Sequence, residues 1–433
     1  MNCQSGIYKK GVRQLVNPHR KLREIAFVSQ LLFLCTLLLF PQSVFSAAPE
    51  LSFGLRTRLE TAQVAEQHAH ALTIKARISV TQNFLERFNT FLQLDNVVSL
   101  DDDKHSNGVN QSAYPTIADP KGTEINQATI QTDWLDTSIT LGRQRIVFGD
   151  QRFIGDLGFR QNDQTYDALR LDKNLLSGSK LTLAYLHNVN RIFGDQAKSA
   201  LSKTDTRFAS LKGIRPKGLL GNHHIDGLLL RFNVNEWDHF DLASYGYAVH
   251  NYHAPTFSNR TFGIEGQYRQ KFGHFKTKTA LDLALQKQQS IQSDWIAYRK
   301  LSASIGYKMF QLGLRHEVLS EKNNAAFITP LATLHKFQGW TDQFINTPSL
   351  GLIDNSISVV FNARPWTIDI RHHLFTTDKG HIDIGKEVDI DLIFKPVRQH
   401  EVKLRIANFN PASDQIIKTN DVRKFFLMYS YNI

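Results

Sequence analysis

The sequence holds two histidine pairs and a run of aspartates that could bind metal ions or take part in catalysis. His223-His224 and His372-His373 could supply metal ligands, or a general base beside a serine. Neighbouring residues on a strand point to opposite faces, so each pair offers at most one ligand to a side. The three aspartates at residues 101–103 lack the ligand spacing of an EF-hand. We therefore predict no metal site, no cofactor and no enzymatic activity.

A glycine-rich stretch at residues 149–158 contains Arg152 and is followed by Arg160. No strand-to-helix switch and no Lys-Ser/Thr pair accompany the glycines, so the stretch is not a phosphate-binding loop. The planar fork of arginine binds carboxylates in a bidentate manner. Recognition of anions is therefore the chemistry that these side chains suit.

The N-terminal segment has the three parts of a secretory signal. Six Lys and Arg residues precede an apolar run at residues 25–40, and Ser46, Ala47 and Ala48 follow it. We predict a signal peptide over residues 1–46, which is cleaved after Ser46 to leave an exported chain of residues 47–433. The alternative is an uncleaved anchor, which the short length of the run and its polar residues disfavour.

Cleavage changes the composition. The 433 residues include 51 Lys+Arg, 40 Asp+Glu and 2 Cys, whereas residues 47–433 keep 45 cations, 39 anions and no cysteine. The lack of cysteine excludes a disulfide-stapled module and a thiol nucleophile, and together with export it favours the bacterial envelope. A mean hydropathy of −0.30 excludes a polytopic helical membrane protein. The modest basic excess, spread over an exported chain, does not indicate nucleic-acid binding.

Apolar and polar residues alternate in runs of about ten residues, the length that a tilted strand needs to cross a bilayer. In one run Ile74, Ala76 and Ile78 share a face, while Lys75 and Arg77 share the other. The pattern predicts one all-β domain, a transmembrane antiparallel up-and-down β-barrel of about 18 strands over residues 47–433. The predicted strands start near residues 51, 70, 86, 124, 137, 164, 180, 224, 239, 260, 276, 298, 309, 355, 366, 385, 400 and 422.

Three features favour a barrel in outer-membrane lipid over a soluble β-sandwich. The strands are long and numerous for a sandwich. The chain ends on an alternating strand with Tyr431 and Ile433, which resembles the terminal strand that the barrel assembly machinery recognises. Aromatic residues also stand at run ends, where interfacial girdles would lie: Tyr245 with Tyr247, Trp295 with Tyr298, and Trp366 with Phe375.

The connections between the predicted strands are unequal in length. Tight ones, such as residues 133–137, are typical of periplasmic turns. Long polar ones at residues 97–122, 193–223 and 320–350 suit extracellular loops or segments folded into the pore.

Three segments resemble a known family. Residues 114–126 read YPTIADPKGTEIN, residues 141–171 read LGRQRIVFGDQRFIGDLGFRQNDQTYDALRL and are followed by HNVNRIFG, and residues 335–352 read HKFQGWTDQFINTPSLGL. Together they are similar to the alginate-export porin-like family of Gram-negative outer-membrane proteins. The resemblance implies a single barrel with an arginine-rich, electropositive lumen, which in the name-giving members passes an acidic polysaccharide outwards.

The basic side chains can also be placed by physical argument. An arginine on the lipid face of a barrel costs about 2–4 kcal/mol at the bilayer midplane, and irregular backbone cannot face lipid at all. We therefore expect ten side chains to point inward and attract anions: Arg56, Arg58, Lys75, Arg77, Arg87, Arg143, Arg145, Arg152, Arg160 and Arg170. The alternative is that they pair with acidic residues and stiffen the barrel; the candidates are Glu60, Asp95, Glu124, Asp133, Asp150 and Asp167.

These observations predict a passive, anion-preferring channel of the Gram-negative outer membrane for acidic saccharides or other polar solutes. A narrower alternative is dedicated export of an acidic, alginate-like exopolysaccharide. Two further alternatives are a lipid-hydrolysing barrel enzyme and a secreted soluble β-protein that binds carbohydrate.

Overall fold

The computed structural model describes residues 48–101, 103–109, 113–175, 178–194, 197, 215–289, 294–413 and 417–433. The predicted signal peptide at residues 1–46, with its apolar run and both cysteines, lies outside the described residues. Among the residues that are described, no helix is both long and apolar enough to pass through a bilayer.

Eighteen strands form one sheet, and most of the described residues belong to it. They are β1 Glu50–Val64, β2 Gln67–Phe84, β3 Phe88–Ser99, β4 Gly122–Trp134, β5 Thr137–Gln144, β6 Thr165–Asn174, β7 Ser179–Asn190, β8 Asn222–Trp237, β9 Phe240–Asn251, β10 Asn259–Phe272, β11 Phe275–Gln288, β12 Ile296–Tyr307, β13 Phe310–Leu319, β16 Leu352–Ala363, β17 Trp366–Thr376, β18 Asp383–Phe394, β19 His400–Pro411 and β20 Val422–Asn432. A small hairpin of β14 Glu321–Lys322 and β15 Ala325–Ala326 lies between β13 and β16.

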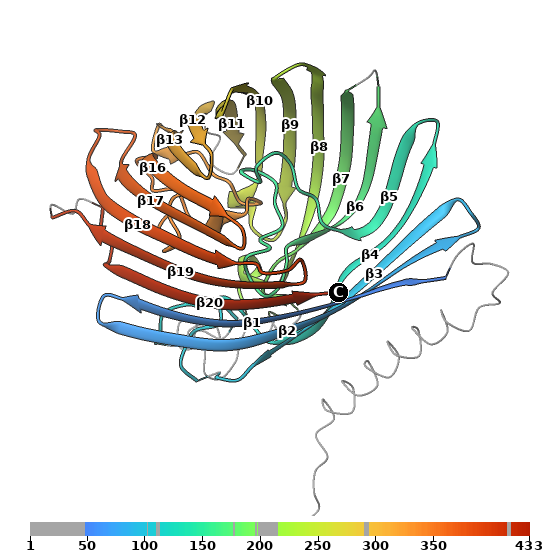
Figure 1. Ribbon diagram of the computed structural model, residues 1–433, viewed down its shortest axis with the longest axis horizontal. Coiled ribbons are helices and arrows are strands. Elements are labelled where there is room, and N and C mark those ends of the chain that lie inside the picture. Colours follow the sequence, from blue (N-terminus) through green and yellow to red (C-terminus); the bar gives the residue numbers. More distant parts are fainter. Residues whose placement is uncertain are drawn as a thin grey trace, which may run out of the picture.

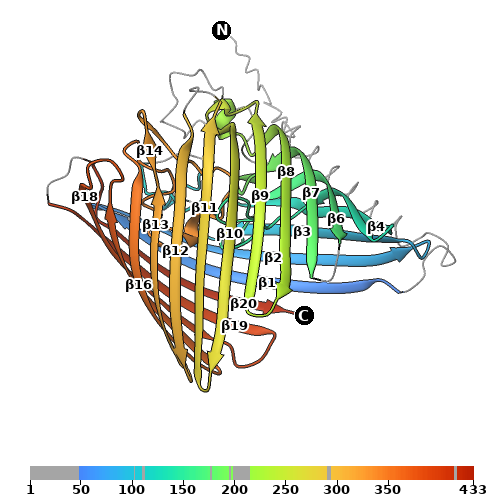
Figure 2. The same cartoon turned by 90° about the horizontal axis from the view of Figure 1, so that it is seen from above.

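Each strand of the sheet pairs antiparallel with its neighbours in the chain, and β1 pairs with β20 to close the sheet into a barrel (Figures 1 and 2). The closing register runs from Gly54 opposite Asn432 to Val64 opposite Val422. Closure leaves no unpaired strand edge, which is the condition for a sheet to span a membrane. The predicted up-and-down barrel of about 18 strands is confirmed.

The strand boundaries also follow the prediction closely. The largest differences are three residues, where starts predicted at 70 and 355 fall at Gln67 and Leu352. The starts at residues 137, 366, 400 and 422 agree with the prediction.

The two faces of the sheet have opposite polarity. On β11, Leu281, Leu283 and Leu285 point outward and are 44%, 38% and 50% exposed. On the other face of the same strand, Asp282 and Gln286 point inward and are buried. An apolar exterior around a polar interior is the inverse of a soluble β-domain, and it is the pattern that contact with lipid demands.

The up-and-down order separates the connections between the two ends of the barrel. The long ones that the structure describes lie at one end, which we call the loop end; the other end, the turn end, has connections such as 135–136, 273–274 and 308–309. Residues 195–196 and 198–214 of the predicted loop at 193–223 lie outside the described residues. Figure 2 shows the two ends from the side. The predicted division into tight turns and long loops is therefore seen in the fold.

Two connections fold back into the barrel from the loop end (Figure 1). The first, residues 145–164, is called here the inserted loop, and the second, residues 320–351, is called the cover loop. Phe153 of the inserted loop contacts Tyr298 at 5.1 Å and Phe327 of the cover loop at 5.8 Å between ring centroids. Ile154 and Phe327 are buried in one continuous hydrophobic cluster that fills this part of the interior.

This cluster corrects one prediction. Tyr245, Tyr247, Tyr298 and Phe375 were expected in interfacial girdles, but all four are buried inside the barrel. They lie on the inward parity of their strands and meet the inserted and cover loops instead of lipid. The other two members of the predicted pairs, Trp295 and Trp366, are exposed.

Candidate functional site

Basic side chains line one side of the interior, across four strands that are consecutive in the closed barrel. Arg56 and Lys75 are directly opposite each other on β1 and β2. Like charges in such a cross-strand pair repel, so the fold must supply anions or hydrogen-bond acceptors nearby. We call this surface the basic wall; it consists of Lys403 and Arg405 on β19, Lys424 on β20, Arg56 and Arg58 on β1, and Lys75 and Arg77 on β2.

One anionic partner of the wall is Asp163 of the inserted loop. Arg77 donates one hydrogen bond to Asp163 at 2.7 Å and two to Asp95 of β3, at 2.7 and 2.5 Å. Lys75 lies 3.8 Å from Asp163 and 3.9 Å from Asp95. Burial alone would raise the pKa of Asp163, but the positive charges of Lys75, Arg77 and Arg145 outweigh it and hold the pKa below its usual range.

Arg56 and Arg58 bind the backbone of the inserted loop. Arg56 donates to the carbonyl of Gly158 at 2.9 Å, to the carbonyl of Arg160 and to the side chain of Gln161 at 2.9 Å. Arg58 donates to the carbonyl of Phe159 at 2.6 Å, and its guanidinium lies 4.2 Å above the Phe159 ring. These contacts satisfy carbonyl groups that the irregular backbone would otherwise leave buried without partners.

A third contact joins the inserted loop to the cover loop. Arg160 donates to Glu60 of β1 at 3.0 Å and to Asp342 of the cover loop at 2.9 Å. Lys424 reaches the same oxygen of Asp342 at 2.7 Å, and His335 lies 2.7 Å from the other. Asp342 thus connects both loops to the wall.

His335 is neutral in this arrangement. Burial lowers the pKa of His335 to about 3, despite the carboxylate of Asp342 beside it. The tautomer that satisfies both neighbours carries its proton on Nδ1, donates to Asp342 and accepts at Nε2 from Arg405 at 2.7 Å. Phe159 stacks on the imidazole at 3.7 Å between ring centroids, which excludes water from one face.

Two other predicted residues also belong to the inserted loop. Arg152 is buried on the side away from the basic wall, where it donates to Glu317 of β13 at 2.6 Å and to Thr329 at 3.2 Å. Arg145 forms an ion pair with Asp156 of the same loop. The inserted loop is therefore attached to β13 as well as to the basic wall.

The remaining predicted residues lie outside this network. Arg143 pairs with Asp167 at 2.8 Å, and Arg170 pairs with Asp172 at 2.7 Å. Arg87 is exposed in the connection between β2 and β3, at the turn end. The pore-lining role of all ten side chains stays a prediction. Pairing, the alternative weighed from the sequence, is observed for Glu60, Asp95 and Asp167.

Two cations of the wall are not neutralised in this way. Among the described residues, Arg56 and Lys403 have no carboxylate within 4.0 Å in an ion pair. Both border a cavity of about 90 Å³ on the inserted loop, together with Gly158, Phe159, Glu401, Met428 and Ser430. A second cavity, of about 350 Å³, lies at the loop end and is bordered by Arg143, Asp163 and Arg191 among others. Both cavities lie against the inserted loop, and each has cations and carboxylates in its lining: Glu401 in the first, and Glu124 with Asp163 in the second.

Several residues of the site were missed from the sequence. Lys403 and Arg405 alternate with Val402, Leu404 and Ile406, so the sequence alone predicts that they point inward. Asp119, Asp163 and Asp342 could not be found in that way, because they lie in irregular segments with no periodicity. Their partners are set by how the loops fold into the barrel.

Comparison with known proteins gives the fold a context. No family model and no curated protein matches the sequence. Solved structures do match: OccAB4 of Acinetobacter baumannii, with TM-score 0.67 and 10% identity over 91% of this chain and 99% of that chain; and OccK9 (OpdG) of Pseudomonas aeruginosa, with TM-score 0.65 and 13% identity over 90% and 99%. OpdK of Pseudomonas aeruginosa, solved with vanillate, has TM-score 0.62 and 10% identity over 89% and 98%.

At these identities the similarity shows the fold alone. The chain has the closed 18-stranded barrel of these Occ and Opd proteins, among which OpdK is described as an outer membrane protein. The sequence resemblance to the alginate-export family finds no support in the comparisons, and it stays a prediction.

Proposed function

We propose that this protein is a porin-like channel of the Gram-negative outer membrane, which passes small anionic or polar solutes and performs no chemistry. The observation that carries the proposal is the pair of cations without a carboxylate partner, Arg56 and Lys403, beside a cavity on the inserted loop. Fixed positive charge inside a low-dielectric wall raises the local concentration of anions. Arginine also suits carboxylates through its planar fork.

The filling of the barrel favours small solutes over a polymer. Arg58, Arg152 and Phe327 are fully buried, and the inserted and cover loops meet in the interior. A polysaccharide could pass only if both loops moved out of the barrel interior. Loss of secreted polymer on deletion of the gene would support dedicated export of an acidic exopolysaccharide instead.

The structural neighbours support the same class of solute. OpdK has been solved with vanillate, an aromatic carboxylate. For this chain we propose small carboxylates, acidic sugars included, as the preferred anions.

The test is current through the purified barrel in planar bilayers with asymmetric salt. We expect single channels whose reversal potential shows anion preference, and we expect Arg56→Gln with Lys403→Gln to shift that potential towards cation preference. Arg87→Gln at the turn end is the matched control and should leave it unchanged. Absence of current from a folded barrel, or hydrolysis of esters by it, would refute a passive channel; an unmoved potential in the double variant would remove these two cations from the path.

A further inference from the structure

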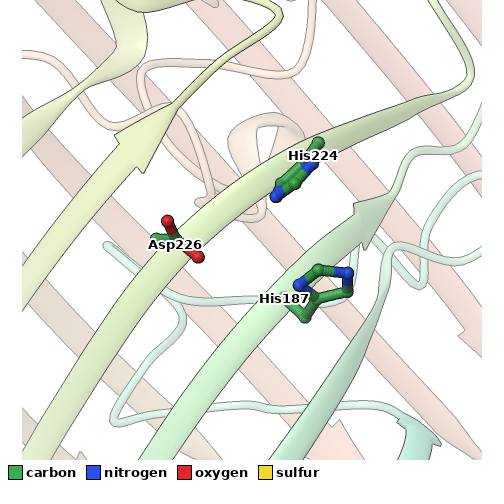
Figure 3. Close-up of side chains that lie close together, drawn as sticks. All are labelled: His187, His224 and Asp226. Carbon is green, nitrogen blue, oxygen red and sulfur yellow. The ribbon is translucent and has the colours of Figure 1, made fainter.

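We propose that His187, His224 and Asp226 form a binding site for a divalent transition-metal ion on the outer face of the barrel, near the loop end. Their candidate ligand atoms all lie within 4.8 Å of one another. Both histidines are exposed, and the three side chains converge across two neighbouring strands (Figure 3). The proposal does not depend on the channel function.

The strand geometry explains why these side chains meet. His224 and Asp226 are two residues apart on β8 and so share its outer face. On β7, Leu186 is opposite Gly227 and Asn188 is opposite His224, so the register shifts around His187. Such a bulge re-aims a side chain, and here it places His187 against both members of the β8 pair.

The same alternation accounts for the neighbouring histidine. His223 is buried inside the barrel, whereas His224 is exposed outside it, as expected for adjacent residues on a strand. The sequence therefore offers one ligand from that histidine pair to the outer face, as predicted. The other two ligands come from residues that the sequence analysis did not connect with it.

The imidazoles are available as ligands. Among the described residues, no hydrogen bond involves a ring nitrogen of His187 or His224; the backbone N–H of His224 donates to His253. The two rings lie 4.8 Å apart between centroids. A neutral imidazole keeps one nitrogen lone pair for a metal.

Asp226 is held in position by two tyrosines. Tyr185 donates its hydroxyl to Oδ1 at 2.7 Å, and Tyr252 donates to Oδ2 at 2.5 Å. Each carboxylate oxygen keeps a further lone pair that can face a metal. Hydrogen bonds of this kind orient ligating carboxylates in metal sites.

The ligand set selects the type of ion. Two imidazoles and one carboxylate suit Zn²⁺, Ni²⁺ or Cu²⁺, whereas Ca²⁺ and Mg²⁺ prefer oxygen ligands alone. Around a tetrahedral Zn²⁺ the ligand atoms lie about 3.4 Å apart, so exposed side chains must close by about 1 Å. The fourth position stays open to water or to an outside ligand.

The test is titration of the full barrel, without a histidine tag, in detergent after removal of metal by a chelator. With Zn²⁺ as the probe we expect one saturable site by calorimetry, and with Cu²⁺ an electron paramagnetic resonance spectrum that shows nitrogen ligands. His224→Ala, His187→Ala and Asp226→Asn each remove or weaken a ligand and should weaken binding by more than the roughly tenfold to hundredfold that loss of an outer-shell partner costs. Tyr252→Phe keeps all three ligands and should weaken it less.

His316→Ala is the matched control. His316 is also exposed, but its Nδ1 is engaged by Asn355 at 2.7 Å on another part of the outer face. The control should bind as the unaltered protein does. Absence of a one-to-one site would overturn the proposal, and so would an affinity of the His187→Ala and His224→Ala variants equal to that of the unaltered protein. Heat-modifiable migration on a gel verifies that each variant is folded.

Discussion

The inserted loop is held in the barrel in two different ways along its length. Its first part places Phe148, Phe153 and Ile154 in a cluster of aromatic and aliphatic side chains. Its second part, residues 156–163, is held by arginine hydrogen bonds to its carbonyls and by buried ion pairs. Burial of apolar surface depends little on pH, whereas ion pairs fail when one partner changes its charge. The first part also holds a buried ion pair between Arg152 and Glu317, so the loop combines a mainly apolar attachment with a mainly ionic one.

Two backbone amides report separately on these attachments. Gly155 N–H donates to the carbonyl of Leu331 at 2.9 Å beside the apolar part, and Gln161 N–H donates to Asp119 at 2.8 Å in the ionic part. Their hydrogen-exchange protection factors measure each attachment in the folded barrel.

The largest effect is expected from Arg160→Met. This change removes the cation that Glu60 and Asp342 share and leaves them Arg58 and Lys424 as partners. Removal of one partner from a buried ion pair costs up to about 3–5 kcal/mol. Protection at Gln161 should fall strongly while Gly155 keeps most of its protection. Equal loss at both amides would show that the two attachments act as one, and Arg87→Met is the control.

A smaller loss is expected from Phe153→Ala in the apolar part. Truncation of a fully buried phenylalanine to alanine lowers the free energy of unfolding by about 3–5 kcal/mol. Phe153 is only partly buried, so the loss should be smaller. Its ring contacts Tyr245, Tyr298 and Phe327. Gly155 should lose more protection than Gln161, which is the reverse of the Arg160 variant. The comparison fails if Gln161 responds more.

Acid should act more strongly on the ionic part than on the apolar part. The pKa values of Asp163 and Asp342 are lowered in the folded state, so their stabilisation is present at neutral pH and is lost as pH falls through the lowered values. His335 also makes acid destabilising. Its pKa is lowered to about 3 in the folded state, whereas the solvated imidazole of the detached loop takes up a proton below about pH 6.5. Protection at Gln161 should decline from about pH 6.5 downwards, and protection at Gly155 should decline less. Parallel decline would contradict the division.

The smallest effect is expected from Arg143→Gln. Arg143 and Asp167 are each about one-third exposed, at 32% and 33% of their side chains. Ion pairs of that kind contribute about 0–1 kcal/mol. Urea unfolding of the variant in lipid vesicles should match the unaltered barrel within about 1 kcal/mol; a loss as large as that of Arg160→Met would place Arg143 in the network.

Strand positions were predictable from the sequence where lipid constrains the chain. Strand starts near residues 137, 366 and 400 were predictable, because a polar side chain on the lipid face is costly and the alternation must persist across the bilayer. The same rule put His372 and His373 on opposite faces, and the structure buries His373.

Side-chain contacts that depend on how distant segments fold together were not predictable from the sequence. Tyr245 and Tyr298 have inward parity, but parity does not tell whether an inward residue meets water or a loop that has folded into the barrel. The pairing of Arg160 with Asp342 joins segments 182 residues apart and leaves no local signal. His187 reached its neighbours only through a register shift, which alternation cannot foresee.

The seam between β1 and β20 has a consequence for assembly. The basic wall extends across it, with Arg56 and Arg58 from the first strand and Lys424 from the last. The docking surface for the second part of the inserted loop is therefore incomplete until the final strand has paired with the first. A barrel that has not closed therefore lacks Lys424 beside Arg56 and Arg58, and the loop has only part of its docking surface.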